Sequence, residues 1–353
     1  AAASTAMAFY SMITGQNCYE TACRDYGDER LFEGETLFDK FKKIGYSSYM
    51  IWDRSYTSFA QKHLKIIFEK ANLIDLDIIP RIPPHTYGKF DDLSFDDKAS
   101  TIALNEIYST FKILAEKDES IFVWLHLPHV LAGRNAYASD IDLFDCVVGY
   151  AREFFGDDSI FVSADHGNMD GKNGKFSYGF DVDETAISIP LISPKIDGND
   201  FINYNTSNIH MFDLLNKHPV KEDFVITDTA YYCQPKRKVS IINGNYKLVY
   251  NKTKKVFQLF DLQWDPEERY NLFYPEFYDT DRLAWYSLNQ RFFYPYWDKA
   301  KEYKDILLKQ FYNIWRTGTF FTEKKNLLKL KLKYLYIAIT QNKRKKNIKN
   351  VGK

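Results

Sequence analysis

The sequence predicts an α/β protein in which helices cover both faces of a largely parallel sheet, followed by a small antiparallel meander. Through the first two thirds of the chain, short apolar runs of strand length alternate with longer helix-like stretches, as in parallel sheets covered by helices. After about residue 220 the apolar runs lie close together, with hairpin signals between them. The 353 residues, 45% of them hydrophobic, can bury a core of this size.

The alternating part contains four candidate strands and four candidate helices. Apolar, β-branched and aromatic runs predict strands over residues 46–52, 76–80, 121–127 and 159–164. The stretches around them predict helices over residues 31–44, 58–71, 97–116 and 140–155. Ligands bind at the carboxyl ends of the strands in such sheets. Residues that directly follow a predicted strand are therefore the first candidates for a site.

The last third predicts a different architecture. Short strands are expected over residues 238–242, 246–251 and 256–260, with an Asn-Gly hairpin signal at Asn243-Gly244. An aromatic, helix-prone segment follows over residues 280–316. We expect an α/β domain over residues 1–220, a β-hairpin and helix subdomain over 221–320, and a basic tail over 321–353.

The formal net charge of zero hides an uneven distribution. Residues 324–353 hold eleven Lys and Arg and no Asp or Glu, which leaves the preceding residues strongly acidic. An acidic body argues against nucleic acid as the main partner. The basic tail is expected either to contact an anionic membrane surface or to be a solvated end. No apolar run approaches the roughly 18–20 residues that span a bilayer.

The strongest candidate site is Asp165-His166-Gly167, directly after the strand predicted over residues 159–164. A carboxylate and an imidazole together suit a divalent metal ion, and glycine lets the backbone turn sharply. An Asp-initiated turn with a surface histidine is the structural alternative.

Two further elements supply candidate side chains. His126 and His129 follow the strand predicted over residues 121–127, and two strand ends that both carry histidine indicate one shared crevice. Lys175 lies in a glycine-containing loop and is a candidate anion ligand, with a solvated lysine as the alternative.

These motifs together resemble the sulfatase branch of the alkaline-phosphatase superfamily. The resemblance covers roughly residues 1–275 and rests on several motifs. They are the Asp165-His166-Gly167 turn, the run ETAISIPLI over residues 184–192, His126-Leu127-Pro128-His129, Gly45-Tyr46 after a helix, and the hairpin motifs NYKLV (245–249), LFDLQWDPE (259–267) and NL (271–272). It implies a three-layer α/β/α, alkaline-phosphatase-like mixed sheet with a small C-terminal antiparallel β meander.

The resemblance also implies a nucleophile at a helix amino terminus, some ten residues before Thr14-Gly15, which places it at Thr5. Sulfatases carry Cys or Ser there, within Cys/Ser-x-Pro-Ser-Arg. The run TAMAF at residues 5–9 is instead similar to the phosphoethanolamine and phosphoglycerol transferases of the superfamily. The Lys-Trp-His run of sulfatases is also replaced, by MIWDR at residues 50–54. Both departures favour phosphoryl transfer and leave hydrolysis open.

The implied activity is a metal-dependent hydrolase or transferase of sulfate or phosphate esters, through a covalent Thr5 intermediate, with glycan- or lipid-linked esters among the expected substrates. A divalent ion (Zn, Mn or Ca) would be held by Asp165, His166 and Thr5. His126 or His129 would protonate the leaving group or hold a non-bridging oxygen, and Lys175 would bind another oxygen.

The family's first strand, which supplies an acidic metal ligand, would precede Thr5, only four residues into this sequence. We therefore expect the sequence to be part of a longer chain. The alternative function is that of a truncated or inactive member that binds an anionic glycan or a partner. The expected location is periplasmic or membrane-associated if an anchor precedes residue 1, and cytoplasmic otherwise.

Overall fold

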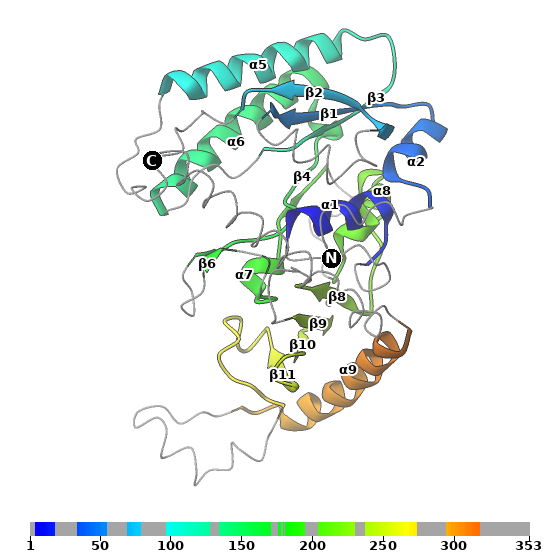
Figure 1. Cartoon of the computed structure of the whole chain (residues 1–353), viewed down its shortest axis with the longest axis vertical. Coiled ribbons are helices and arrows are strands. Elements are labelled where there is room, and N and C mark those ends of the chain that lie inside the picture. Colours follow the sequence, from blue (N-terminus) through cyan, green and yellow to red (C-terminus); the bar gives the residue numbers. More distant parts are fainter. Residues whose placement is uncertain are drawn as a thin grey trace, which may run out of the picture.

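The computed structural model describes the chain in separate ranges: residues 4–17, 34–54, 69–78, 97–127, 134–170, 176–177, 179, 181–194, 204–229, 237–273 and 294–317. Figure 1 shows a parallel sheet with two long helices at one end of the molecule and an antiparallel sheet with one long helix at the other. The helix that begins at Thr5 lies between the two sheets.

The parallel sheet has the strand order β2-β1-β3 within the described residues. Strand β1 (Ser47–Asp53) is central and pairs in parallel with both β2 (Asn72–Leu76) and β3 (Ile121–Leu125). Successive side chains of a strand point to opposite faces. Met50 and Trp52 accordingly belong to one apolar cluster, and Ile51 to another.

Helices cover both faces of this sheet. Helices α5 (Asp97–Ala115) and α6 (Arg134–Phe155) pack side by side on the face that carries Ile51. Helices α1 (Thr5–Thr14), α2 (Leu37–Lys43) and α8 (Met211–Leu215) pack on the face that carries Trp52. This α/β/α layering confirms the predicted fold class.

Local sequence signals set the ends of the first helices. Thr36 caps α2, because its side chain accepts from the Asp39 amide and the Asp39 carboxylate accepts from the Thr36 amide. This capping box explains why α2 begins later than the helix predicted over residues 31–44. Helix α1 ends at Gly15, whose positive φ of 69° suits a residue without a side chain.

Two strand predictions need correction. The strand predicted over residues 76–80 lies over Asn72–Leu76 instead, because its partner β1 ends at Asp53, which is paired with Leu76. Only residues 69–70 of the helix predicted over 58–71 that precedes it have a described helical conformation, and residues 55–68 lie outside the described ranges.

The strand predicted over residues 159–164 is reduced to β4 (Val162–Ser163), because a 3-10 turn over Asp157–Ser159 takes up its beginning. Strand β4 pairs antiparallel with β7 (Leu191–Ile192) in a separate two-stranded sheet. A second short pair joins β5 (Met169–Asp170) to β6 (Phe176–Ser177). Two short helical segments, α7 (Glu184–Ile187) and η5 (Asn208–His210), complete this region.

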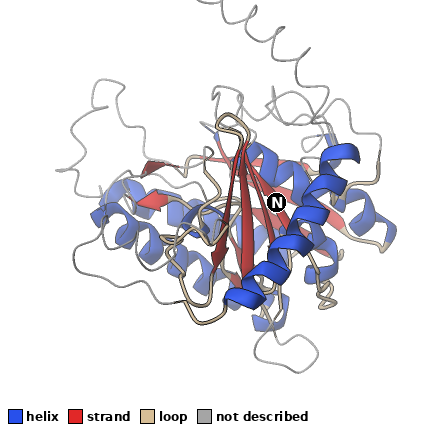
Figure 2. Cartoon of the chain, turned by 90° about the horizontal axis from the view of Figure 1, so that it is seen from below, coloured by secondary structure: helices blue, strands red, loops and turns tan. Residues whose placement is uncertain are grey.

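The C-terminal sheet confirms the predicted meander and adds one strand. Its order is β11-β10-β9-β8, all antiparallel. Strands β9 (Lys238–Asn243), β10 (Tyr246–Asn251) and β11 (Val256–Asp261) match the three predicted runs, and β8 (Val225–Asp228) was not predicted. Helix α9 (Trp297–Thr317) lies across one face of the sheet (Figure 2) and buries Leu307 against Leu248 and Leu259.

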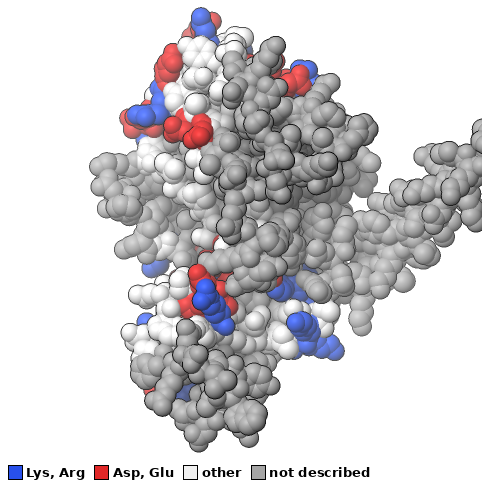
Figure 3. All heavy atoms as spheres, turned by 90° about the vertical axis from the view of Figure 1, so that its left-hand side faces the viewer, with Lys and Arg blue, Asp and Glu red and all other residues white. Residues whose placement is uncertain are grey.

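The surface and the chain ends bear on the partner predictions. On the face drawn in Figure 3, acidic and basic side chains of the described residues lie next to one another. None of the helices in the described ranges is both long enough and apolar enough to cross a membrane. The basic tail lies outside the described residues. Its membrane contact and the division of the chain at residues 220/221 stay predictions.

Candidate active site

Thr5 is the first residue of α1, and its hydroxyl lies 2.9 Å from Nε2 of His166. Helix α1 is fixed in place because all its other residues are buried, mostly apolar ones that pack under β1 and β3. The first amide groups of a helix have no partner within the helix, and its macrodipole is positive at this end. An anion or an alkoxide at Thr5 would therefore be stabilised electrostatically.

The Asp165-His166-Gly167 turn fixes the imidazole that faces Thr5. Nδ1 of His166 lies 2.7 Å from the carbonyl oxygen of Gly167, which can only accept, so Nδ1 carries the proton. Nε2 then presents its lone pair to the Thr5 hydroxyl. The Asp165 carboxylate accepts from the His166 amide at 2.9 Å, and its second oxygen lies 3.4 Å from His166 Nε2.

Gly167 is required by the space around it. A Cβ atom at this position would lie 2.1 Å from the carbonyl oxygen of Thr185, far inside van der Waals contact. The close approach lets the Gly167 amide donate to the Ala186 carbonyl at 2.9 Å. The turn is therefore docked against α7.

His126 follows β3 and lies beside this turn. Its ring stacks on Trp52, with centroids 4.3 Å apart, and meets Phe9 edge-on at 5.1 Å. Burial lowers the pKa of His126 to about 4, although the charge of Asp165 opposes this shift. His126 is therefore neutral at neutral pH, and it supplies a proton to a leaving group only if a bound anion raises its pKa.

The donor atoms present fit a divalent cation. Asp165 Oδ2 lies 3.4 Å from His166 Nε2, and the Thr5 hydroxyl is the third atom of the group. With the proton on Nδ1, a neutral imidazole offers its Nε2 lone pair to such an ion. Two ligands that are each about 2.1 Å from a tetrahedral ion lie about 3.4 Å apart. Asp165 Oδ2 and His166 Nε2 have this spacing. Within the described ranges, no set of three or more His, Cys, Asp and Glu side chains is placed to hold a metal ion.

Two asparagines, one beside the turn in space and one next to it in the sequence, have side-chain oxygens without a described partner. Oδ1 of Asn208 and Oδ1 of Asn168 are buried and have no hydrogen-bond partner among the described residues. Asn208 lies beside the turn, because its amide nitrogen is 3.4 Å from the Asp165 carbonyl oxygen. Asn168 is two residues beyond His166. Carboxylate, amide and hydroxyl oxygens with one imidazole suit Mn²⁺, Ca²⁺ or Zn²⁺.

Comparison with known proteins identifies the fold. No family model and no curated protein matches the sequence. Among solved structures, the chain is similar to a 2-O GAG sulfatase, with 13% identity and a TM-score of 0.58 over 89% of this chain and 82% of that one. It is also similar to a putative sulfatase from Bacteroides thetaiotaomicron, with 12% identity and a TM-score of 0.60 over 90% and 83% of the two chains.

A third similar structure is the phosphonate monoester hydrolase of Agrobacterium radiobacter, with 13% identity and a TM-score of 0.50 over 80% of this chain and 84% of that one. The chain has the sulfatase fold. It is the fold that the Asp165-His166-Gly167 turn and the hairpin motifs indicated.

Within this sulfatase fold, the predicted site residues are only partly assembled. Thr5, Asp165 and His166 are brought together from α1 and the turn after β4, and His126 lies beside them. His129 and Lys175 lie outside the described residues, so their roles stay predictions.

Two polar residues of this site were not predicted. Asp53, the last residue of β1, is 1% exposed, and its charge, like that of Asp165, opposes the lowering of the His126 pKa by burial. Its position directly after a predicted strand was the signal that could have found it. Asn208 carried no such signal, because it follows no strand and belongs to no motif.

Proposed function

We propose that this chain hydrolyses sulfate or phosphate esters, with Thr5 as the nucleophile. The observation that supports this most directly is the 2.9 Å contact between the Thr5 hydroxyl and His166 Nε2 at the amino terminus of a buried helix. The sulfatase fold supports it independently, because sulfatases and a phosphonate monoester hydrolase share this arrangement of elements.

The chain's own groups account for a two-step reaction. In the first step, Thr5 Oγ1 forms a bond to sulfur or phosphorus, and the bond to the ester oxygen breaks. The departing oxygen takes up a proton, for which His126 and His129 are the proposed sources. In the second step, the oxygen of water attacks the same centre and the bond from that centre to Thr5 Oγ1 breaks. Oγ1 takes up a proton from the water, and the other proton leaves with the sulfate or phosphate product or passes to solvent. The α1 amides and Lys175 are the proposed partners of the non-bridging oxygens.

A divalent cation held by Asp165, His166 and Thr5 would supply positive charge that lowers the pKa of the Thr5 hydroxyl and neutralises the oxygens of the ester. The single lone pair on His166 Nε2 serves either this cation or the Thr5 proton, and not both. We propose the first use for the active enzyme, in which the Thr5 proton is lost to solvent before attack.

The test compares two neighbouring hydroxyls. The chain is assayed with 4-nitrophenyl sulfate, 4-nitrophenyl phosphate and a phenylphosphonate monoester, each with Mn²⁺, Zn²⁺ or Ca²⁺ and with a chelator. Thr5→Ala is expected to lower kcat/KM on the order of 10³-fold. Ser4→Ala is the matched control, because Ser4 is also buried and its side chain makes no capping hydrogen bond.

The proposal predicts a mass adduct on Thr5 after rapid quenching of the wild type, absent in Thr5→Ala. Equal loss of activity in Ser4→Ala and Thr5→Ala would overturn the assignment of the nucleophile. Activity that persists in the chelator would overturn the role of the cation. Product analysis with added alcohols separates hydrolysis from transfer, the finer activity suggested by Thr at the nucleophile position.

A second candidate function is binding without turnover. The observation that favours it is the small number of ligands in the described ranges, where the carboxylate of Asp165 and the neutral imidazole of His166 lie at the cation position. Retention of a sulfated glycan without hydrolysis of any of the three esters would favour this function.

A further inference from the structure

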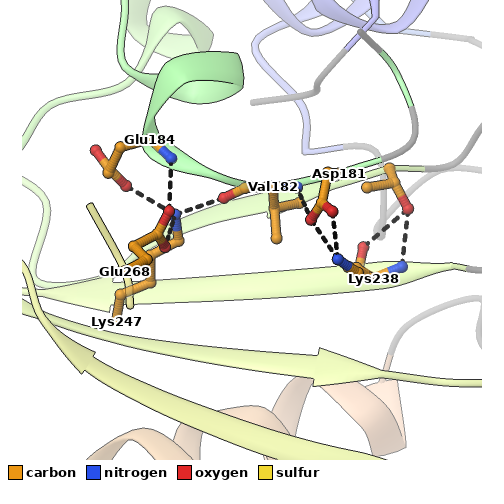
Figure 4. A network of polar contacts seen from close by, with 7 residues as sticks. Asp181, Val182, Glu184, Lys238, Lys247 and Glu268 are labelled. Carbon is orange, nitrogen blue, oxygen red and sulfur yellow. Dashed lines mark hydrogen bonds and ion pairs between the residues drawn. The ribbon is translucent and has the colours of Figure 1, made fainter. Parts of the chain in front are cut away.

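Lys247 in β10 is a fully buried cation, with 0% of its side chain exposed. Its ammonium group meets three acceptors: the Val182 carbonyl oxygen at 2.5 Å, Glu184 Oε1 at 2.8 Å and Glu268 Oε1 at 2.7 Å. An ammonium group has three hydrogens to donate, so its hydrogen-bonding capacity is filled. Figure 4 shows Lys247 reaching from the C-terminal sheet toward the segment that contains Val182 and Glu184.

Glu268 holds the same segment from a second direction. While Oε1 of its side chain pairs with Lys247, Oε2 accepts from the backbone amide of Glu184 at 2.8 Å. The Glu268 side chain is only 6% exposed. Its φ of 54° lies in the left-handed region, which is costly for a residue with a side chain and persists where the surrounding contacts fix it.

The segment is also held at its other end. Lys238 in β9 contacts both carboxylate oxygens of Asp181, and the Asp181 side chain is 5% exposed (Figure 4). Between these two polar anchors, Val182 packs against Val249 and Phe260 of the sheet. The start of α7 is therefore fixed to the C-terminal sheet by ion pairs on both sides of an apolar contact.

Helix α7 contacts the Asp165-His166-Gly167 turn directly. The Ala186 carbonyl accepts from the Gly167 amide at 2.9 Å, and the Gly167 carbonyl accepts from His166 Nδ1 at 2.7 Å. This second bond keeps the proton on Nδ1 and leaves the Nε2 lone pair facing Thr5. A continuous series of contacts thus runs from Lys247 through α7 to the lone pair that the proposed reaction uses.

We propose that Lys247 and Glu268 are positioning residues that fix the orientation and tautomer of His166 through α7. Their catalytic consequence rests on the proposed function, whereas their effect on the His166 ring does not. Neither residue contacts the group of atoms at Thr5, so both act through the backbone of α7 and Gly167.

The test separates positioning from plain stability. Lys247→Met removes the charge and keeps an apolar chain of similar length, and Glu268→Gln keeps an acceptor for the Glu184 amide while it removes the charge. The matched control is Arg237→Met, which breaks another buried ion pair of the same sheet, to Asp228 of β8. For each variant, ¹⁵N NMR of the imidazole reports the His166 tautomer, and thermal unfolding reports stability. Assays well below the unfolding temperature give kcat and KM.

In Lys247→Met and in Glu268→Gln, we expect His166 to change from a single Nδ1–H tautomer to a mixture of the Nδ1–H and Nε2–H tautomers. Their kcat should fall about tenfold or more with KM within about twofold, as for displacement of a reacting group. Arg237→Met should lower the unfolding temperature and leave the His166 tautomer and kcat unchanged. An unchanged His166 signal in both network variants would overturn the proposal.

Glu268→Gln decides the question if Lys247→Met does not fold, because it preserves the packing and one of the two acceptor roles. If the wild type turns over none of the test esters, the proposed function fails, and the tautomer measurement still supports or overturns the positioning role.

Discussion

The C-terminal sheet and the region around Thr5 and His166 are built in contrasting ways. In the sheet, neighbouring strands pair over four to six residues, and one apolar cluster joins them to α9. Around the site, β4, β5, β6 and β7 are each two residues long, and the functional side chains lie in a turn and at a helix end.

The positioning proposal implies that the site depends on the C-terminal sheet for part of its rigidity. Short elements with few pairings open locally at low free energy, yet the proposed chemistry needs a fixed imidazole. The ion pairs of Lys247 and Glu268 join the two regions, and in this proposal the long strands stabilise the turn through them.

The largest effect is expected from the core of the C-terminal sheet. Leu259 is 0% exposed and lies at the centre of the cluster that includes Leu248 and Leu307. Leu259→Ala should lower the free energy of unfolding by about 3–5 kcal/mol, because it leaves a cavity. Urea unfolding measures this loss, with Ile306→Ala on α9 as the control, since Ile306 is exposed.

The same unfolding experiment tests whether the two regions are coupled. If the C-terminal sheet stabilises the site, the His166 NMR signal and tryptophan fluorescence should follow one transition in Leu259→Ala. A His166 signal that persists after the fluorescence transition would show that the site region is stable by itself.

The next effect is a dependence of stability on pH that arises in the site region. Burial lowers the pKa of His126 to about 4, from an ordinary value near 6.5. Between these values the unfolded chain binds the proton and the folded chain does not, so protonation favours unfolding. Folding stability from this group is complete above about pH 6.5 and falls by on the order of 3 kcal/mol as the pH falls to about 4.

Replacing His126 with an aromatic ring that cannot titrate isolates this contribution. His126→Phe keeps ring contacts to Phe9 and Trp52 and should flatten the fall in stability between pH 6.5 and 4. Urea unfolding at several pH values gives both curves. Identical slopes in the two proteins would mean that another group causes the pH dependence.

A smaller effect is expected from Gly167→Ala, because the new Cβ would lie 2.1 Å from the Thr185 carbonyl oxygen and must push α7 away. Such overpacking costs about 1–3 kcal/mol. The loss should appear in the His166 tautomer as well as in thermal unfolding. A variant with normal His166 signals would show that the turn does not need its contact with α7.

The sequence predicted the parts of this architecture that local patterns determine. Apolar runs of strand length predicted β1 and β3, and turn residues such as Asn243-Gly244 predicted the meander hairpins. Asp165 and His166 were found because they directly follow a predicted strand. The correct grouping of Thr5 with them came from the family resemblance, because no local pattern marks a lone threonine 161 positions away from His166.

Other features depend on partners distant in the sequence. The bounds of β2 are set by its register with β1, and β4 pairs only with β7, a strand of two residues. The burial of Lys247 was also not predictable, since lysine on a strand usually indicates a solvent-facing position. Only its pairing with Glu184 and Glu268, 63 and 21 residues away, makes that burial tolerable.

The smallest effect is expected from the same substitution at a different glycine. Gly149 lies in the interior of α6 and is exposed, and a Cβ atom added there would meet nothing within 4 Å beyond the backbone of its own helix. Because alanine favours the helix, Gly149→Ala should raise the free energy of unfolding by about 0.5–1 kcal/mol. Thermal unfolding of Gly149→Ala and Gly167→Ala should thus show shifts of opposite sign. A loss of stability in Gly149→Ala would mean that α6 packs against another part of the protein at this position. Gly149 would then not differ from the crowded Gly167 as expected.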